Sequence, residues 1–531
     1  MTVETFATAT VHAPSGMVVT PDHLASSAGV AILRAGGSAA DAAVAAGAVL
    51  AVTNQHECGM GGDLFALVHQ PGERPAALCA AGRAGSGADP VQLRAEGHQR
   101  MPSPGDVRAV TVPGCVDGWI ELHRRFGRLP LAEVLEPAMT YAAAGFPVSP
   151  QLAESVTGLV HRPGADDYRD PAMAAGGRVP AGALIRRPGV AAALDAVVTG
   201  GRAGFYLGAF GYGLIALGDG LFTWADLARN QAEWMEPLHT TAWGYDVWGT
   251  PPPSQGYLTL AGVAVAEGLD LPAPDDPAWA HLLSEAARQV GADRPQVLHE
   301  GADGAALLAP ERIAAQRAAI DPDRRRDLAP LTAGGGTVAC CVVDRDRMGV
   351  SLLQSNASAW GAGLAEPETG IFLHNRGIGF SLEAGHPAEY GPGRRPPHTL
   401  APALVTRPDG SLRSVLATMG GDAQPQILVQ LLARLLHHGE PAGAAVDAGR
   451  WVLAAAPFRT WDDGGPGVLA VEPHASAAWD DGLRARGHTV TRHEEPHHAF
   501  GHAQVIDVDA GEGVLDAAAD PRALVGAAAG Y

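Results

Sequence analysis

The residues with the clearest chemical potential are a run of glycines that ends at a threonine. Gly334, Gly335 and Gly336 precede Thr337, and mostly apolar residues typical of a buried strand follow it. Because Gly336 has no Cβ, a hydroxyl can approach its carbonyl carbon, and the bond can adopt a strained conformation. Attack by the Thr337 hydroxyl would give an ester, which water would hydrolyse. The sequence therefore predicts a self-cleavage site between Gly336 and Thr337.

Cleavage at this site would give Thr337 a second function, because it would become the first residue of a new chain. A free α-amino group has a pKa of about 7.7–8.0, so it can take the proton of the neighbouring hydroxyl near neutral pH. One residue would then supply both nucleophile and base. The alternative interpretation is a flexible loop that enters a strand, with no chemistry.

An acyl-transfer nucleophile also needs hydrogen-bond donors for the oxyanion that forms on the substrate. The stretch VLATMGGDAQPQ places Gly420 and Gly421 between a predicted strand and a predicted helix that begins near Pro425. Adjacent glycines at such a turn can expose backbone N–H groups to a ligand. We therefore predict that Gly420 and Gly421 form the oxyanion hole.

Composition excludes several other kinds of enzyme and partner. All 37 basic residues are arginine, so a Schiff-base lysine and the lysine of a phosphate-binding loop are both impossible. The net charge of −20 argues against nucleic acids and anionic membranes as partners. We expect a small-molecule substrate and no cofactor.

Cysteine usage and the N-terminal residues bear on the compartment. The five cysteines have no C-x-x-C spacing and lie mostly in apolar surroundings, which predicts free thiols in a reducing compartment. The first 16 residues have no basic segment followed by an apolar one. The most apolar stretch, 39–52, is too short to span a bilayer. We expect a cytoplasmic protein without a membrane partner.

One motif imitates a metal site. HEEPH at His493–His497 matches the zinc-protease pattern H-E-x-x-H, which requires a helix to place both imidazoles on one face. Pro496 would break that helix. With His498 and His502 nearby, we interpret the segment as a solvated histidine-rich loop and expect no metal site.

The elements that would position these residues follow from periodicity and capping signals. Ser38 and Asp41 have the spacing of a capping box, and Thr223 is a predicted N-cap. Strands dominate just after Thr337, with helices on both sides in the sequence, which favours packed sheets covered by helices. The predicted helices are 24–35, 38–52, much of 109–202, 223–230, 307–321 and 425–439. The predicted strands are one that begins at about Leu64, 245–249, 337–344, 348–356, 370–375 and 413–419.

Taken together, the motifs resemble the γ-glutamyltransferase family of N-terminal nucleophile (Ntn) hydrolases. The likeness extends over nearly the whole chain and includes GMGGDLFALV, TVPGCVDGWIELHRRFGRLPLAEVLEPAMTYAAAGFPVSP, SLLQSN, RRPPHTLAPALV and TMGGDAQPQ. The resemblance implies an α/β (α+β) fold, an αββα sandwich of two mainly antiparallel sheets. It also implies a precursor that is cut into a large subunit, 1–336, and a small subunit, 337–531. These would form an intertwined heterodimer, with further dimerisation left open.

The resemblance also assigns roles to individual residues. Thr337 falls on the nucleophile, Gly420 and Gly421 on the oxyanion glycines, and Ser355 on a threonine beside the nucleophile. Arg83, His398 and Thr399 fall where the family holds a substrate carboxylate. Asn356 lies beside the position of an asparagine that contacts the substrate amine, and Asn375 and Arg376, in HNRG, are further candidates for substrate binding.

Two departures from the family bear on the substrate. Arg376 and Gly379 stand where γ-glutamyl enzymes carry a glutamine and an aspartate that bind the substrate amino group. A true γ-glutamyl donor is therefore disfavoured, and the chain looks more like the branch with cephalosporin-acylase-like and oxamate-amidohydrolase-like members. In the alternative interpretation neither arginine binds substrate: Arg83 is a surface cation, and Arg376 pairs with Glu366 or Glu368.

We therefore expect a self-processing amidohydrolase that cleaves an acyl or amide bond in a small carboxylate-bearing substrate, through an acyl-enzyme on Thr337. One alternative is a genuine γ-glutamyltransferase or glutathione hydrolase. The other is an unprocessed pseudoenzyme with a binding or assembly role.

Overall fold

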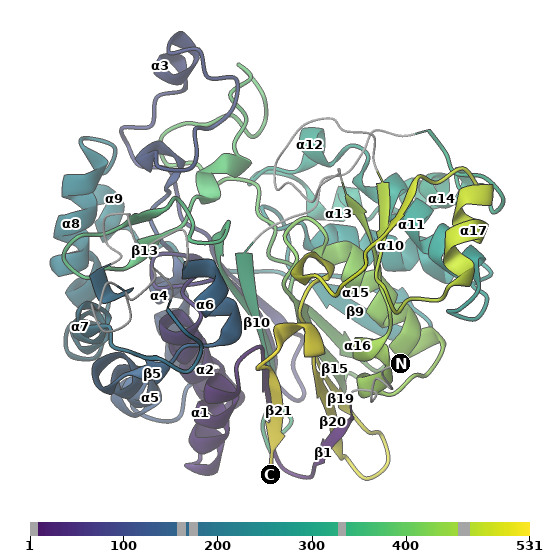
Figure 1. Ribbon diagram of the computed structural model, residues 1–531, viewed down its shortest axis with the longest axis horizontal. Helices are drawn as coiled ribbons and strands as arrows, with labels where there is room; N and C mark the ends of the chain where they lie inside the picture. Colours follow the sequence, from purple (N-terminus) through teal and green to yellow (C-terminus); the bar gives the residue numbers. More distant parts are fainter. Residues whose placement is uncertain (1–8, 157–165, 169–178, 328–335, 455–467) are drawn as a thin grey trace.

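Two seven-stranded antiparallel sheets lie at the centre of the protein, with helices on both outer sides (Figure 1). The structure is a computed structural model and describes residues 9–156, 166–168, 179–327, 336–454 and 468–531. The order of helix layer, sheet, sheet and helix layer confirms the predicted αββα sandwich. Each sheet packs one face against the other sheet and one against helices, so the inner strands β3, β10, β11, β14 and β19 are buried along their whole length.

The first sheet contains the predicted nucleophile. Its order is β21 (Ala527–Gly530), β2 (Met17–Thr20), β10 (Gly336–Val343), β11 (Gly349–Ala357), β3 (Asp63–His69), β4 (Ala76–Ala80) and β7 (Glu233–Met235). The predicted strand at 337–344 is confirmed as β10, and the predicted strand at 348–356 as β11. Gly336 opens β10, which lies between β2 and β11 inside the sheet.

The second sheet faces the first across an apolar core that includes Cys341, Leu353, Val415 and Ile506. Its order is β1 (Val11–Ala13), β20 (Leu515–Ala519), β19 (Ala503–Val508), β15 (Leu412–Thr418), β14 (Ala403–Thr406), β9 (Tyr245–Gly249) and β8 (Leu238–Ala242). Small additional sheets are formed by β5 (Phe146–Pro147) with β6 (Leu184–Ile185), β12 (Leu364–Ala365) with β13 (Phe372–Leu373), and β16 (Trp451–Ala454), β17 (Val468–Val471) and β18 (Val490–Arg492).

Helices from the first half of the chain cover the first sheet, and later helices cover the second (Figure 1). The first group is α1 (His23–Arg34), α2 (Ala39–Thr53), α4 (Cys115–Phe126), α5 (Leu131–Ala144), α6 (Pro150–Val156), α7 (Pro188–Tyr206), α8 (Ala209–Gly218) and α9 (Trp224–Ala228). The second includes α10 (Gly256–Glu267), α11 (Pro277–Gly291), α15 (Gln424–Leu432), α16 (Ala442–Asp447) and α17 (Ala478–Ala485). Shorter elements are α3 (Pro90–Ala95), α12 (Arg294–Val297), α13 (Gly304–Leu307), α14 (Pro310–Ala318), η1 (Val107–Ala109), η2 (Asp166–Tyr168), η3 (Arg376–Gly379), η4 (Ala433–His437), η5 (His498–Phe500) and η6 (Pro521–Ala523).

Local signals in the sequence account for several helix boundaries. Ser38 and Asp41 form the predicted capping box at the start of α2, and Thr223 caps α9. The helix predicted over 307–321 is confirmed as α14, but it begins only at Pro310, and Leu307 belongs to the preceding short helix α13. Proline has no N–H to donate and disfavours helical geometry in the preceding residue, so it starts a helix rather than continuing one.

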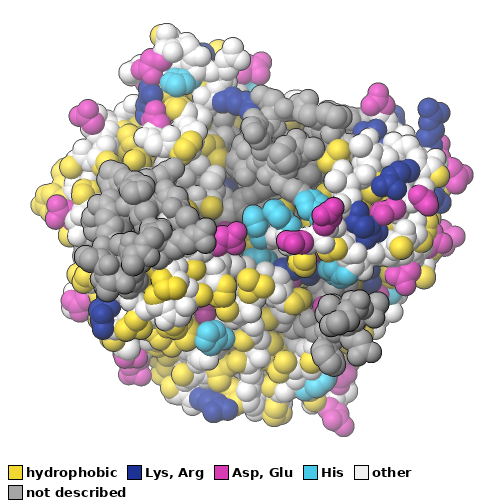
Figure 2. All heavy atoms as spheres, in the orientation of Figure 1, with side chains coloured by type: hydrophobic (Ala, Val, Ile, Leu, Met, Phe, Trp, Pro, Cys, Tyr) yellow, Lys and Arg dark blue, Asp and Glu magenta, His cyan; other side chains and the backbone are white. Residues whose placement is uncertain are grey.

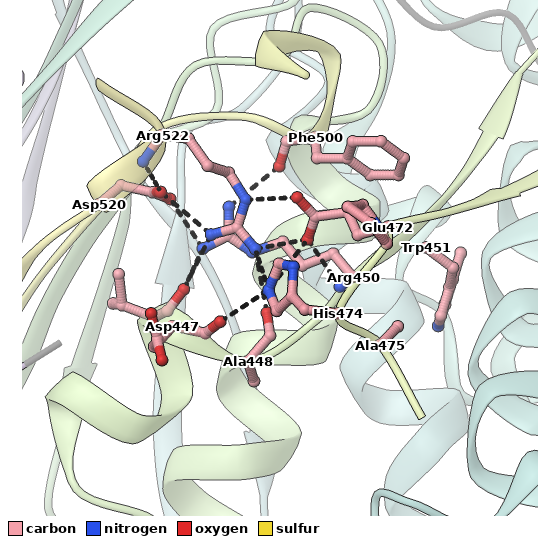
Figure 3. A network of polar contacts seen from close by, with 12 residues as sticks. Asp447, Ala448, Arg450, Trp451, Glu472, His474, Ala475, Phe500, Asp520 and Arg522 are labelled. Atoms are coloured by element: carbon pink, nitrogen blue, oxygen red, sulfur yellow. Dashed lines mark hydrogen bonds and ion pairs between the residues drawn. The ribbon is translucent and has the colours of Figure 1, made fainter. Parts of the chain in front are cut away.

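A buried network of charges joins the C-terminal segments (Figure 3). Asp520 forms ion pairs of 2.8 Å with Arg450 and 3.0 Å with Arg522. Arg522 also pairs with Glu472 at the end of β17. Two arginines and two carboxylates balance in charge, and they bind one another rather than facing a cavity. We interpret this network as structural, because its ion pairs hold the C-terminal segments against one another.

Two expectations from the sequence bear on the described residues, the absence of a membrane span and the absence of a metal site. No helix in the described ranges is both long and apolar enough to cross a bilayer. Among the same residues, histidines, cysteines and carboxylates form no group of three that could hold a metal ion. His493–His497 lies between β18 and η5, outside any α-helix. Figure 2 shows histidines gathered near the middle of one face, beside acidic side chains.

Candidate active site

The hydroxyls of Thr337 and Ser355 meet at the start of β10. Thr337 Oγ1 donates a hydrogen bond of 3.1 Å to Ser355 Oγ. Ser355 Oγ in turn donates one of 2.5 Å to the carbonyl oxygen of Gly336. Thr337 and Ser355 are both buried. The predicted nucleophile and the predicted scissile carbonyl are thus linked through one hydroxyl.

An irregular register in the sheet creates this meeting. Gly336 pairs with Ala357 and Val338 with Gln354, so β11 carries one extra residue opposite Thr337. Such a bulge re-aims side chains, and bulges are common beside active sites. Ala357 has a positive φ of 72°, and its N–H donates to Ser355 Oγ at 2.9 Å. The bulge therefore fixes the Ser355 side chain against Thr337.

Glu57 completes the contacts of the peptide bond between Gly336 and Thr337. The N–H of Thr337 donates to Glu57 Oε2 at 3.0 Å. A Cβ on Gly336 would lie 2.9 Å from the same oxygen and 3.0 Å from the backbone nitrogen of Ala359, so a larger residue would be crowded there. Burial raises the pKa of Glu57 to about 7, although the Thr337 N–H opposes the shift. Sequence reasoning missed Glu57, whose only signal was an acidic residue in the glycine-rich loop HECGMGGD.

Arg376 lies beside Ser355 and is almost completely buried. Its Nη2 donates to Ser355 Oγ at 2.9 Å, and its Nη1 donates to Thr399 Oγ1 at 3.0 Å. The sequence alternative of a pair with Glu366 is not found, since Glu366 binds the backbone N–H groups of Glu368 and Thr369 instead. Burial lowers the pKa of Arg376 to about 10, so the group keeps its charge at neutral pH.

His398 faces the protein interior. Its Nε2 lies 3.1 Å from Asp63 Oδ2, and its Nδ1 accepts the N–H of Leu400 at 3.3 Å. Burial, followed by the nearby Arg376, lowers the pKa of His398 to about 3, which keeps the ring neutral. The same carboxylate oxygen lies 3.3 Å from His374 Nδ1. Because both of its ring nitrogens are engaged, His398 offers no spare donor to a substrate carboxylate.

The predicted oxyanion glycines lie in a turn between β15 and α15. Gly420 has a φ of 137° and Gly421 a φ of 54°, both in the region that favours glycine. Gln255 Nε2 donates 2.8 Å hydrogen bonds to the carbonyls of Thr399 and Gly421. Together with the contacts of Arg376, this side chain connects the glycine turn to Thr337 through a chain of hydrogen bonds.

Arg83 is mostly buried, with 15% of its side chain exposed. Its Nη1 donates to Glu300 Oε2 at 3.0 Å and to the carbonyl of Gly393 at 3.2 Å. The preceding residue, Gly82, donates its N–H to Asp63 at 2.9 Å. The loop carrying Arg83 is therefore tied to the carboxylate beneath His398, and a ligand carboxylate at Arg83 would compete with Glu300.

The two predicted asparagines have different surroundings. Asn356 is buried, and its Nδ2 donates to the carbonyl of Gln55 at 3.0 Å. Asn375 binds the backbone N–H and the hydroxyl of Ser358, both at 3.0 Å. Asn375 and Ser358 also line a cleft of about 1210 Å³, whose wall includes Gly379. Asn356 thus binds the loop that carries Glu57, whereas Asn375 lines the cleft in which a ligand could bind.

One residue in the wall of the cleft, Ala359, lies next to Gly336 at the start of β10. Ala359 lines the cleft, and its backbone N lies 3.0 Å from the place of a Cβ on Gly336. The arrangement therefore joins a hydroxyl, a hydrogen-bonded carbonyl and a buried carboxylate at the edge of a space that admits small molecules. These are the groups that acyl transfer from an amide requires.

Comparison with known proteins identifies the family. The family model described as gamma-glutamyltranspeptidase matches residues 25–531. The chain belongs to this family. The γ-glutamyltranspeptidase family comprises Ntn hydrolases, so the protein is an enzyme of the amidohydrolase and acyltransferase type.

Relatives within the γ-glutamyltranspeptidase family extend over nearly the whole chain. The oxamate amidohydrolase proenzyme of Klebsiella pneumoniae is 36% identical, covering 97% of this chain and 98% of its own. The acylase ACY 1 proenzyme of Pseudomonas sp. strain V22 is 32% identical, covering 90% and 87%. The crystal structure of cephalosporin acylase from Bacillus halodurans superposes with a TM-score of 0.90 at 31% identity, covering 100% and 98%.

Proposed function

We propose that the protein is a self-processing amidohydrolase whose nucleophile is Thr337. The observation that carries the proposal is the shared contact of Ser355 with the Thr337 hydroxyl and with the carbonyl of Gly336. Cleavage would give fragments 1–336 and 337–531. Each central sheet takes strands from both fragments, which supports an intertwined heterodimer rather than two separable domains.

The reaction would use Thr337 as both base and nucleophile. After cleavage, the α-amine takes the proton of its own hydroxyl, and Oγ1 attacks the acyl carbon of the substrate. Backbone N–H groups at Gly420 and Gly421 stabilise the oxyanion, the amine product leaves, and water hydrolyses the acyl-enzyme. No step needs a cofactor.

The substrate we propose is a small amide that carries a carboxylate and no amino group beside it. Arg376 keeps a buried positive charge close to the nucleophile, which suits an anionic substrate and opposes an ammonium group. Gly379 lines the cleft without a side chain, and a Cβ there would lie 2.6 Å from the carbonyl of Pro397. Arg83 supplies a second cation once its pairing with Glu300 is exchanged for the substrate.

The test is the chain composition of the purified protein. Mass spectrometry should find one fragment ending at Gly336 and one beginning at Thr337, while Thr337→Ala should remain a single chain. Thr199→Ala changes an exposed threonine of α7 and should be cleaved normally. A wild-type protein that stays intact after long incubation at neutral pH would favour the unprocessed binding protein. Release of glutamate from glutathione, with and without an acceptor dipeptide, tests the γ-glutamyltransferase alternative.

A further inference from the structure

The carboxyl group of Glu57 lies against the nitrogen of the peptide bond that we propose is cleaved. Glu57 Oε2 is 3.0 Å from the nitrogen of Thr337 and accepts its N–H. The same oxygen would be 2.9 Å from a Cβ on Gly336, so it also lies against the Cα of that residue. Ser355 occupies the other end of the same peptide unit, at the carbonyl oxygen. Both ends of the bond are therefore held by side chains that can carry protons.

Glu57 is held in this position by the strand that carries Ser355. Asn356 donates its backbone N–H to the carbonyl of Glu57 at 3.0 Å and its Nδ2 to the carbonyl of Gln55 at 3.0 Å. The backbone N–H of Trp360 donates to the carbonyl of His56 at 2.7 Å. The loop before β3 is thus fixed to the bulge in β11 and to the segment that follows β11, so the distance from Glu57 to Thr337 is set by the folded core.

We propose that Glu57 is the acid that gives a proton to the nitrogen of Thr337 when the bond to Gly336 breaks. The inference rests on the proposed self-processing and names the residue that completes it. An amide nitrogen is a poor leaving group until it is protonated, so breaking the C–N bond requires a proton donor within hydrogen-bond distance. Glu57 is the ionisable side chain hydrogen-bonded to that nitrogen in the described structure.

The first step forms the new bond without a change in net charge. Thr337 Oγ1 bonds to the carbonyl carbon of Gly336 while its proton passes to Ser355 Oγ, 3.1 Å away. Ser355 passes its own proton to the Gly336 oxygen over 2.5 Å. The product is a neutral five-membered ring whose central carbon carries a hydroxyl and is bonded to both the oxygen and the nitrogen of Thr337.

The second step breaks the C–N bond. Its electron pair stays on the nitrogen of Thr337, which takes the proton of the Glu57 carboxyl group. The ring hydroxyl loses its proton through Ser355 to water, and the carbonyl of Gly336 re-forms as an ester. The Glu57 carboxylate then takes this one proton back from water, which restores its acid form, and water hydrolyses the ester to a Gly336 carboxyl group and the free Thr337 hydroxyl.

The groups around Glu57 leave it able to hold a proton. His56 Nε2 lies 3.9 Å from Glu57 Oε1, but burial, then His502 and His498, lowers the pKa of His56 to about 3. His56 is therefore neutral and brings no positive charge. Burial raises the pKa of the neighbouring Cys58 thiol, so it stays uncharged as well. Burial of Glu57 itself raises its pKa to about 7, and the acid form is well populated at neutral pH.

The experiment measures the rate of self-cleavage of newly made chains. Wild type, Glu57→Gln, Glu57→Asp, Thr337→Ala and Glu311→Gln are labelled in a cell-free synthesis, shifted to buffers from about pH 5.5 to about pH 9, and followed on denaturing gels. Glutamine keeps an oxygen that can accept the Thr337 N–H but has no proton of this acidity. Glu311 is exposed on α14 and controls for the substitution itself.

We expect Glu57→Gln to slow self-cleavage by about 100-fold or more, the usual contribution of a positioned acid. The wild-type rate should be level below about pH 7 and fall as pH rises above it, because the acid form of Glu57 is lost there. Glu57→Asp should restore part of the rate and keep the decline at high pH. Glu311→Gln should match the wild type.

The outcomes separate this inference from the proposed function. Two results would show that Glu57 is not the acid while self-processing stands. In the first, wild type is cleaved and the self-cleavage rate of Glu57→Gln is within about threefold of the wild-type rate. In the second, the rate of Glu57→Gln falls above pH 7 as the wild-type rate does. If wild type is not cleaved under any condition, both the proposed function and the inference about Glu57 are wrong. If Glu57→Gln does not fold, judged by circular dichroism against Thr337→Ala, a wild-type rate unchanged from about pH 6 to about pH 9 overturns the inference.

Discussion

Arg376 Nη2 donates a hydrogen bond of 2.9 Å to Ser355 Oγ, so a buried cation supports the hydroxyl that contacts both Gly336 and Thr337. The other amino group of the same guanidinium binds Thr399. A positive charge is therefore part of the surroundings of Thr337, the proposed nucleophile, before any substrate arrives. This charge has a direct consequence for substrate choice.

Donors without an amino group should be hydrolysed better than γ-glutamyl donors. An ammonium placed close to Arg376 in a buried site meets a repulsion on the order of a few kcal/mol, and each ~1.4 kcal/mol changes the rate tenfold. We expect kcat/KM for glutaryl-p-nitroanilide to exceed that for γ-glutamyl-p-nitroanilide by about 100-fold. Arg376→Gln should bring the ratio of the two kcat/KM values closer to one. This ratio does not change when a variant loses activity toward both substrates equally. A clear preference of wild type for the γ-glutamyl compound would contradict the prediction.

Arg83→Ala should weaken substrate binding without affecting self-cleavage. Loss of a charge-assisted hydrogen bond costs about 1.5–3 kcal/mol, which corresponds to about 10- to 150-fold in kcat/KM, expressed mainly in KM. Glu300→Gln removes the carboxylate that now holds Arg83 and should lower KM for anionic substrates. Steady-state kinetics with the glutaryl compound measures both effects. Loss of processing in Arg83→Ala would show that this residue is structural.

Gly421→Ala should abolish most of the hydrolytic activity of an otherwise folded protein. The φ of 54° at Gly421 disfavours a Cβ, and a shifted turn would misdirect the N–H groups for the oxyanion. Removing one such donor lowers kcat by about 10²- to 10³-fold. Gly410→Ala is a matched control, because Gly410 has a φ of 82° in an exposed turn with open space around it. Equal loss of kcat in the two variants would refute the oxyanion assignment.

Asp520→Asn should destabilise the fold in a pH-dependent way. Burial alone would raise the pKa of Asp520, but Arg450 and Arg522 outweigh it and hold the pKa well below its usual range. A carboxyl group with a lowered pKa stabilises the folded state above its unfolded pKa of about 3.9 and loses that contribution as pH falls. The difference in unfolding free energy should be about 3–5 kcal/mol at neutral pH and shrink below about pH 4.

Thermal melting of the wild type and Asp520→Asn across this pH range measures the effect. Asp481→Asn is a suitable control, because the Asp481 side chain is fully exposed and its partner Arg484 is 3.7 Å away. We expect Asp481→Asn to have the same melting temperature as the wild type at every pH. A constant difference between Asp520→Asn and wild type down to about pH 3 would show that the carboxyl charge is not the stabilising feature.

Local patterns in the sequence were sufficient for much of the fold. The strand after Thr337, the capping box of Ser38 with Asp41 and the glycine turn before α15 depend on residues close together in the chain. Capping, turn geometry and strand periodicity act over a few residues, so they can be recognised from the sequence alone. The boundaries of α14 show the limit, since the sequence predicts this helix from residue 307 and it begins at Pro310.

The sequence by itself determined which chemistry was possible, and the tertiary structure decided which groups take part in it. The absence of lysine and the Gly336–Thr337 junction already indicated a threonine nucleophile. The partner of its nitrogen, Glu57, lies 280 positions away along the chain, and no local pattern encodes that distance. Likewise, only the packed sheets show that Arg376 faces Ser355 and that His398 faces Asp63. Contacts between distant segments depend on how the sheets pair and where β11 bulges, because these set the direction of every buried side chain.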